Sequence, residues 1–299
     1  MEPLFVLAPG RSYTSVISTM LGQHPQLYGV PELNLNAADS MAEWWRLHGL
    51  GFNWLAHGLL RAVAEICFGC QNDRTILEAR SWLRMRLGQS TAEVFRELAT
   101  AVQPCGLVEK SPGMVDSPEE IARYATAFPE ARYLHLLRHP RSTGRSMLSS
   151  EWGRACAAFV DSYDYSTSPP VLDAQIAWYR IHMTIGTFLD TVPADRVFRL
   201  RGEDLLEQPA LHLAAIAEWL GVRTDQEAIS AMMHPEESPF ACFGPPSAAF
   251  GQDPSFLRDP ELRPYVDQDN NLDDPLAWRG DGKGFLSEVR MLAEAFGYS

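Results

Sequence analysis

The amino-acid sequence predicts an α/β protein in which a doubly wound, mostly parallel sheet is flanked by helices. Two observations support this class: short, nearly continuous apolar runs alternate with longer segments of helical periodicity, and each main apolar run ends in a polar loop. Nearly continuous apolar runs are typical of parallel strands, because helices cover both faces of such a sheet. We expect the 299 residues to form one domain, 1–299, since a chain of this length can bury one large core.

The predicted elements alternate along the chain, which favours a parallel sheet. Strands are expected at residues 4–8, 105–109, 132–137 and 196–201, with a short extended piece near 26–30. Helices are expected at residues 14–22, across much of 37–68, and at 90–102, 117–127, 141–151, 172–190, 209–220 and 284–297.

Composition excludes several classes of function. The net charge of −13 argues against broad binding to nucleic acid or to an anionic membrane. The sequence has no apolar run long enough to span a bilayer and no signal peptide at its start, so a cytoplasmic location is expected. Cys67 and Cys70 form a lone C-x-x-C without a second ligand pair, so we expect free thiols and no metal.

A polar loop follows the first predicted strand and opens a helix, which is an arrangement that binds phosphate groups. The loop contains Pro9, Gly10, Arg11 and Ser12. It lacks the Gly-Lys-Ser/Thr of an ATP or GTP phosphate loop, in which the hydroxyl holds Mg²⁺. The sequence therefore predicts a nucleotide phosphate bound without the usual metal arrangement; the alternative is an ordinary strand-to-helix connection.

Cationic residues follow three of the predicted strands. Arg11, Lys110 and Arg138 each come directly after a strand, and Lys110 is one of only two lysines among 25 basic residues. Because ligands of open parallel sheets bind beyond the carboxyl ends of the strands, these side chains are predicted to form one anion site. Ser146 lies eight residues after Arg138, about two helical turns on, where the two side chains can bind one phosphate together.

A long segment without helical or strand periodicity runs from about residue 233 to 284. It holds eight prolines between His234 and Gly284, yet it also contains apolar anchors such as Phe240 and Phe256. Irregular segments of this length are uncommon in compact domains unless they are functional or disordered. We predict a packed lid over the substrate; the alternative is a surface segment that merely covers the sheet.

Together these motifs make the chain resemble sulfotransferases that use 3′-phosphoadenosine 5′-phosphosulfate (PAPS). The motifs that match are the 5′-phosphosulfate loop at Arg11, Ser12, Tyr13, Thr14 and Ser15, the 3′-phosphate pair Arg138 and Ser146, and the triplet Glu203, Asp204 and Leu205. The chain departs from the family pattern at two positions. Tyr13 replaces a loop glycine, and Gly202 stands where many members carry tyrosine.

The resemblance implies a sulfotransferase fold related to phosphate-loop nucleoside triphosphatases, with PAPS as co-substrate and 3′-phosphoadenosine 5′-phosphate (PAP) as product. The matching motif residues are expected to bind the donor, and so is Arg201, which ends the fourth main strand. Sulfuryl transfer resembles phosphoryl transfer, an in-line displacement catalysed by positioning and electrostatics. Arg11 and Lys110 are suited to stabilise the leaving phosphate, so no metal is required.

Two residues are candidates for the base that accepts the acceptor proton. Glu32 matches the glutamate of tyrosylprotein-type sulfotransferases, as Lys110 matches their active-site lysine; the alternative for Glu32 is a carboxylate at a helix entry. His234 lies in a stretch, residues 233–245, that resembles sulfotransferase domains of modular polyketide synthases, where a histidine faces a substrate that already carries negative charge. The alternative for His234 is a solvated loop side chain.

The predicted function is therefore metal-independent transfer of a sulfuryl group from PAPS to a hydroxyl of a small or carrier-protein-tethered acceptor. No nucleic acid or membrane partner is expected. Two alternatives stay open: a small-molecule or nucleotide kinase on a related fold, and a non-catalytic module that only binds the nucleotide. The absent Gly-Lys-Ser/Thr argues against the kinase, and the presence of Glu32 and Lys110 argues against the module.

Overall fold

The computed structural model describes residues 1–50, 53–266 and 270–299. In these residues, a parallel sheet of five strands has the order β2-β3-β1-β4-β7. The strands are β1 (Leu4–Leu7), β2 (Leu27–Gly29), β3 (Gly106–Glu109), β4 (Arg132–Leu137) and β7 (Val197–Arg201). The predicted fold class is confirmed, and each predicted strand lies within about one residue of its observed bounds.

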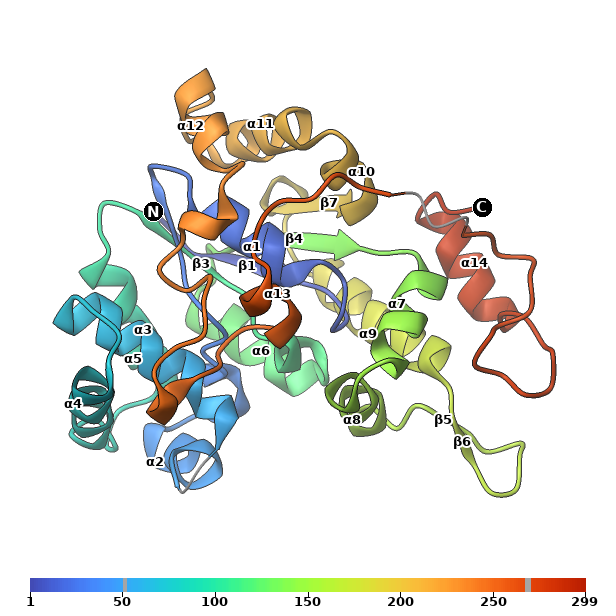
Figure 1. Cartoon of the computed structure of the whole chain (residues 1–299), viewed down its shortest axis with the longest axis horizontal. Helices are drawn as coiled ribbons and strands as arrows, with labels where there is room; N and C mark the ends of the chain where they lie inside the picture. The colour runs from blue at the N-terminus through green and yellow to red at the C-terminus, as the bar shows by residue number, and fades with distance from the viewer. Residues whose placement is uncertain (51–52, 267–269) are drawn as a thin grey trace.

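Helices cover both faces of the sheet, as Figure 1 shows. The central strand β1 is fully buried, and its side chains alternate between two cores. Phe5 and Leu7 pack on one side with residues of α3, α5, α6 and α9, whereas Leu4 and Val6 pack on the other side with residues of α1 and α11. The bounds are α1 (Thr14–Gly22), α3 (His57–Phe68), α5 (Thr91–Ala101), α6 (Pro118–Ala127), α9 (Ala174–Leu189) and α11 (Pro209–Leu220).

Strand order decides which loops meet. β1 pairs with β3 on one side, with Leu4 opposite Val108, and with β4 on the other, with Leu4 opposite Arg132. The loops after β1, β3 and β4 therefore leave neighbouring strands at the same edge of the sheet. These are the loops that carry the three predicted cations.

Some predicted helices are interrupted by local capping. The expected helix 141–151 is two helices, α7 (Pro140–Leu148) and α8 (Glu151–Phe159), because the Ser150 hydroxyl accepts the Gly153 N–H at 3.0 Å and starts a new helix. The expected helix at 37–68 is broken into α2 (Met41–Trp44), two short turns and α3; residues 51–52 of that range lie outside the described residues.

Several elements were not predicted. They are α4 (Asp73–Arg84), α10 (Gly202–Glu207), α12 (Gln226–Ala231), α13 (Pro254–Arg258) and the small antiparallel hairpin of β5 (Tyr163–Asp164) and β6 (Val171–Leu172). The last helix, α14 (Ser287–Ala295), was expected. α4 begins with a capping box, in which Asn72 and Thr75 exchange side chain-to-backbone hydrogen bonds, a signal that the sequence does contain.

The irregular segment after α12 packs against the rest of the protein at several points; residues 267–269 of it lie outside the described residues. In Figure 1 the orange part that carries α13 crosses in front of the sheet. The buried Arg61 of α3 donates to the Phe250 carbonyl at 3.2 Å, and the Glu32 N–H donates to the Gly251 carbonyl at 2.8 Å. Gly251 has φ 121°, and an ideal Cβ there would lie 2.8 Å from the Gly58 Cα, so this close crossing requires glycine.

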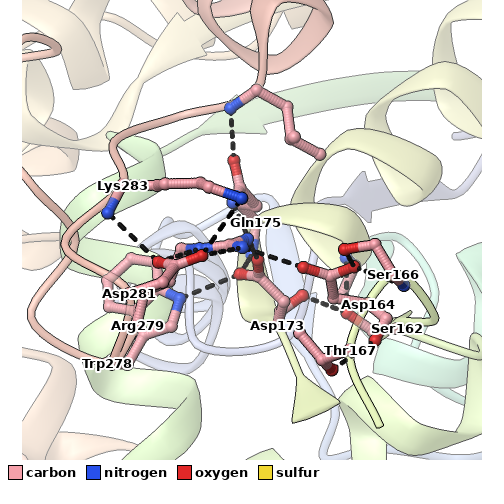
Figure 2. Close-up of polar contacts among 12 residues, drawn as sticks. Ser162, Asp164, Ser166, Thr167, Asp173, Gln175, Trp278, Arg279, Asp281 and Lys283 are labelled. Carbon is pink, nitrogen blue, oxygen red and sulfur yellow. Dashed lines mark hydrogen bonds and ion pairs between the residues drawn. The ribbon is translucent and has the colours of Figure 1, made fainter. Parts of the chain in front are cut away.

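The C-terminal part of the segment is held by an ion-pair cluster, shown in Figure 2. The Arg279 guanidinium pairs with Asp164, Asp173 and Asp281, and the Trp278 indole N–H donates to Asp173 at 2.9 Å. Asp173 also caps α9 by accepting the Gln175 N–H. This cluster ties the segment to the β5–β6 hairpin and to the start of α9.

Candidate functional site

The loop between β1 and α1 presents unpaired backbone donors. Arg11 (φ 70°) and Tyr13 (φ 60°) adopt the left-handed conformation, which bends the chain into a concave turn of N–H groups. Tyr13 precedes α1 and makes no side-chain cap, so the N–H groups of the first turn are free to bind an anion. Ser12 is fully buried, and its hydroxyl has no partner within the described residues.

Lys110 joins this loop to the loop after β2. Its ammonium lies 3.1 Å from the Ser15 hydroxyl, in the first turn of α1, and 2.5 Å from Glu32 Oε1. Lys110 is only 3% exposed. One buried cation therefore contacts both the predicted anion-binding loop and the predicted base.

The second pair of predicted donor-binding residues also meets the loop. Arg138 donates from Nη1 to the Arg11 carbonyl at 2.6 Å, and its Nε has no partner in the described part of the chain. The Arg11 Nε donates to the Ser146 hydroxyl of α7 at 3.1 Å. Burial lowers the pKa of Arg11, and the nearby Arg138 lowers it further, as expected where two cations lie close together.

Glu32 is positioned by the residues on either side of Lys110. The Glu109 carboxylate accepts the Leu33 N–H at 3.3 Å, and the Ser111 hydroxyl accepts the Asn34 N–H at 2.9 Å. Glu109 is fully buried, and this burial raises its pKa to about 7. The positioning roles of Glu109 and Ser111 were not predicted from the sequence, although both residues flank Lys110 at a strand end.

Tyr13 and Gly202, the two departures from the family pattern, lie against each other. An ideal Cβ at Gly202 would lie 2.6 Å from Tyr13 Cδ2, so the Tyr13 ring fills the space that a side chain at 202 would need. Arg138 also lies near that ring, with its guanidinium carbon 4.1 Å from the ring centroid. Tyr13 thus packs beside Arg138, which is one of the two residues predicted to bind the 3′-phosphate.

Two predicted site residues lie elsewhere. His234 is half-exposed and pairs with Glu236 at 2.9 Å, and it lines none of the cavities described below. Arg201 makes two hydrogen bonds to the Asp204 carboxylate, at 2.8 and 2.7 Å, and donates to the Gly297 carbonyl. Its guanidinium is therefore occupied away from the loop.

Two cavities adjoin the loop, and a third shares a wall with one of them. A donor pocket of about 160 Å³ lies over Tyr13, Arg138, Ser146 and Phe256. A near chamber of about 290 Å³ is lined by Glu32 and Lys110, and it shares Arg11, Thr14, Ser15 and Asp253 with the donor pocket. A far chamber of about 370 Å³ continues from the near chamber. The wall residues common to the near and far chambers are Glu32, Asn34, Leu55, Pro112, Trp152 and Cys156.

Several cavity residues had no signal in the sequence. Asp253 of the irregular segment forms an ion pair with Arg11. Trp54 and Trp152 meet edge to face, with ring centroids 4.2 Å apart. The Cys156 thiol is protonated at neutral pH, because burial and then the charges of Asp116 and Glu32 raise its pKa to about 12.

The described residues contain neither a candidate metal site nor a candidate membrane-spanning helix. Among the described residues, no group of three His, Cys, Asp or Glu side chains could hold a metal ion. Within the same residues, no helix combines the length and apolar character that crossing a membrane requires.

Comparison with known proteins identifies the fold and the family. No curated protein sequence matches the chain significantly. The solved sulfotransferase domain from the curacin biosynthetic pathway is 22% identical and has a TM-score of 0.78, with 100% of this chain and 98% of that chain covered. The sulfotransferase domain from the Synechococcus PCC 7002 olefin synthase is 23% identical and has a TM-score of 0.73, with 99% and 94% covered.

The family follows from the sequence itself. A model of the sulfotransferase family matches residues 3–226, about three quarters of the chain. The matched range contains β1 to β7 with the loops that carry Arg11, Lys110 and Arg138. The chain belongs to the sulfotransferase family.

Proposed function

We propose that this protein transfers a sulfuryl group from PAPS to a hydroxyl group of its acceptor. The observation that carries the proposal is the position of Lys110, whose ammonium contacts Ser15 of the anion-binding loop and Glu32 of the near chamber. A group bound between these residues has a cation and helix N–H donors on one side and a carboxylate base on the other.

Donor binding would use the groups already on the loop. The 5′-phosphosulfate would lie on the N–H groups of residues 12–15 and beside Arg11 and Lys110, which the uncapped start of α1 supports. The 3′-phosphate would bind Arg138 and Ser146 in the donor pocket. Arg201, which is held by Asp204, has no part in this scheme.

The chemical step would be an in-line displacement at sulfur. The acceptor oxygen attacks the sulfur, the bond from sulfur to the bridging phosphate oxygen breaks, and its electron pair leaves with that oxygen. Arg11 and Lys110 stabilise the charge that develops there, and Glu32 takes the acceptor proton. His234 pairs with Glu236 and lines none of the three cavities, so this scheme gives it no role.

The acceptor is proposed to be a small or carrier-tethered alcohol or phenol. The walls of the near chamber are largely apolar and aromatic, with Trp54, Trp152 and Phe250 among them. The two similar solved domains come from a biosynthetic pathway and a synthase, which supports testing a tethered acyl alcohol beside free alcohols.

The test is PAP release from PAPS with a panel of phenols and alcohols, combined with calorimetric titration of PAP. Glu32→Gln is expected to lose transfer while keeping PAP affinity, and Arg138→Ala to lose PAP affinity. Glu119→Gln and Arg145→Ala are controls, because both side chains are exposed. ATP hydrolysis or phosphoryl transfer with Mg²⁺ would instead indicate a kinase, and PAP binding without transfer to any acceptor would indicate a binding module.

A further inference from the structure

The far chamber is lined by acidic side chains without cationic ones among the described residues. Asp116 and Glu120 both line it, together with Glu32 from the shared wall, whereas no lysine or arginine lines it among the described residues. The Asp116 and Glu120 carboxyl groups make no hydrogen bond or ion pair with the rest of the described chain. The nearest arginine on the same helix, Arg123, is engaged with Asp39 and with the Asn36 carbonyl, both at 2.8 Å.

A second, buried group points to a ligand in the same chamber. Asn36 is 2% exposed and lines the chamber, and its amide oxygen has no partner among the described residues. An ideal Cβ at Gly113 would lie 3.6 Å from Asp116 Oδ2 and 3.8 Å from Asn36 Nδ2, so the two side chains converge on one spot. The ring nitrogens of His48, which also lines the chamber, are buried and unpaired in the described chain. Buried polar groups without partners are costly, so such a set indicates a ligand-binding site.

A ligand that satisfies these groups must be rich in hydrogen-bond donors. An amide oxygen, a neutral imidazole nitrogen and ionised carboxylates all accept hydrogen bonds. Burial raises the pKa of Asp116 and of Glu120 to about 7, and a bound cation favours the ionised form of both. Burial lowers the pKa of His48, which keeps its ring neutral. Trp152 and Phe159 add aromatic faces to the chamber wall, and aromatic faces attract cations.

We propose that the far chamber binds a cationic nitrogen, an ammonium or amine group carried by the acceptor whose hydroxyl reacts beside Glu32. This inference rests on the proposed function, since the near chamber then holds the hydroxyl and the continuous far chamber holds the amine of one molecule. The two chambers share Glu32, Trp152 and Cys156, so a single acceptor can extend through both.

The test compares matched ligands on the PAP-bound enzyme. Tyramine and tyrosol have the same phenol and similar size, but one carries an ammonium and the other a neutral hydroxyl. Calorimetry is expected to give about 10-fold or greater preference for tyramine, because hydrogen bonds between charged groups are about twice as strong as neutral ones. Asp116→Asn and Glu120→Gln are each expected to reduce this preference, and the double variant to abolish it, with PAP affinity unchanged. Glu119→Gln, exposed on the same helix, is the matched control.

Each result separates this inference from the proposed function. Equal binding of tyramine and tyrosol, or a preference that survives in the double variant, would overturn the amine site even if sulfuryl transfer is observed. Binding of Mg²⁺ or Ca²⁺ that depends on Asp116 and excludes tyramine would also overturn it. Asp116-dependent tyramine binding without transfer from PAPS would support the site and contradict the proposed function.

Discussion

The ring of Tyr13 occupies the space beside Gly202, where any side chain would collide with it. Tyr13 adopts the left-handed conformation at φ 60°, which costs a non-glycine residue about 1 kcal/mol or more. The contact therefore explains two departures from the family pattern as one compensated change: the ring sits in the loop and glycine makes room for it.

This contact predicts strong coupling between positions 13 and 202. Gly202→Ala is expected to destabilise the protein by about 1–3 kcal/mol, the usual cost of overpacking, and to weaken PAP binding, because the displaced ring pushes on Arg138. In a Tyr13→Gly background the same change is expected to cost little, since the ring is gone and glycine relieves the φ strain. Urea unfolding of the four proteins in the cycle measures this coupling; additive effects of the two changes would show that the contact is unimportant.

The ion pair between Lys110 and Glu32 predicts a separation of stability from activity. Lys110→Ala leaves the Glu32 carboxylate, which is 14% exposed, without its cation, and we expect a loss of about 3–5 kcal/mol. The double variant Lys110→Met with Glu32→Gln is expected to recover most of that stability. It is not expected to recover sulfuryl transfer. Lys283→Ala, which alters the other lysine at a 69% exposed side chain, is the control. Full activity in the double variant would remove both residues from the mechanism.

Removing the charge of Asp253 is expected to strengthen donor binding, whereas removing the charge of Arg138 is expected to weaken it. Its carboxylate pairs with Arg11 at the boundary of the donor pocket and the near chamber, where the phosphosulfate is proposed to bind. Asp253→Asn removes the competing charge but keeps an oxygen that can accept the Ser255 N–H at the start of α13. We expect PAP to bind about three- to tenfold more tightly to this variant, measured by calorimetry.

The control for this prediction is Asp259→Asn, which alters another ion pair of the same segment, with Arg263. That change is expected to leave PAP affinity as it is. Weaker PAP binding by Asp253→Asn would instead mean that Asp253 holds Arg11 in its binding position.

The sequence predicted the parts of the site that local pattern determines. Arg11, Lys110 and Arg138 were found because each follows an apolar strand, and the order of parallel strands then brings them together. Glu32 was found from the resemblance, and the structure places it against Lys110. Their roles in catalysis remain predictions that the proposed experiments address.

The remaining features depend on contacts between segments far apart in the chain. Asp253 reaches Arg11 only because Arg61 and Glu32 fix the path of residues 250–251, which have no periodic pattern. The far chamber likewise combines Asn36 with the start of α6, and no local signal connects these segments. His234 was selected from a resemblance in this irregular region, where position in sequence says little about position in space.

A buried histidine pair predicts how stability depends on pH. His135 and His182 are fully buried and lie 2.9 Å apart between Nε2 and Nδ1, and burial lowers the pKa of His182 from 6.5 to about 3. Below pH 6.5 the unfolded chain binds a proton that the folded protein does not, so the contribution of His182 to stability is lost as pH falls toward 3. The loss for one such histidine is about 1.4 kcal/mol per pH unit.

The pKa of His135 is lowered in the same direction, by burial first and then by His182 and Arg199. We expect the free energy of unfolding in urea to fall between pH 6.5 and 4.5, and to fall less steeply for His182→Gln, whose amide can still bond His135. Carboxyls with a raised pKa, such as Glu109 at about 7, act in the opposite direction, so the difference between variant and wild type is the relevant measurement. Parallel pH profiles for the two proteins would mean that His182 is already protonated in the folded state.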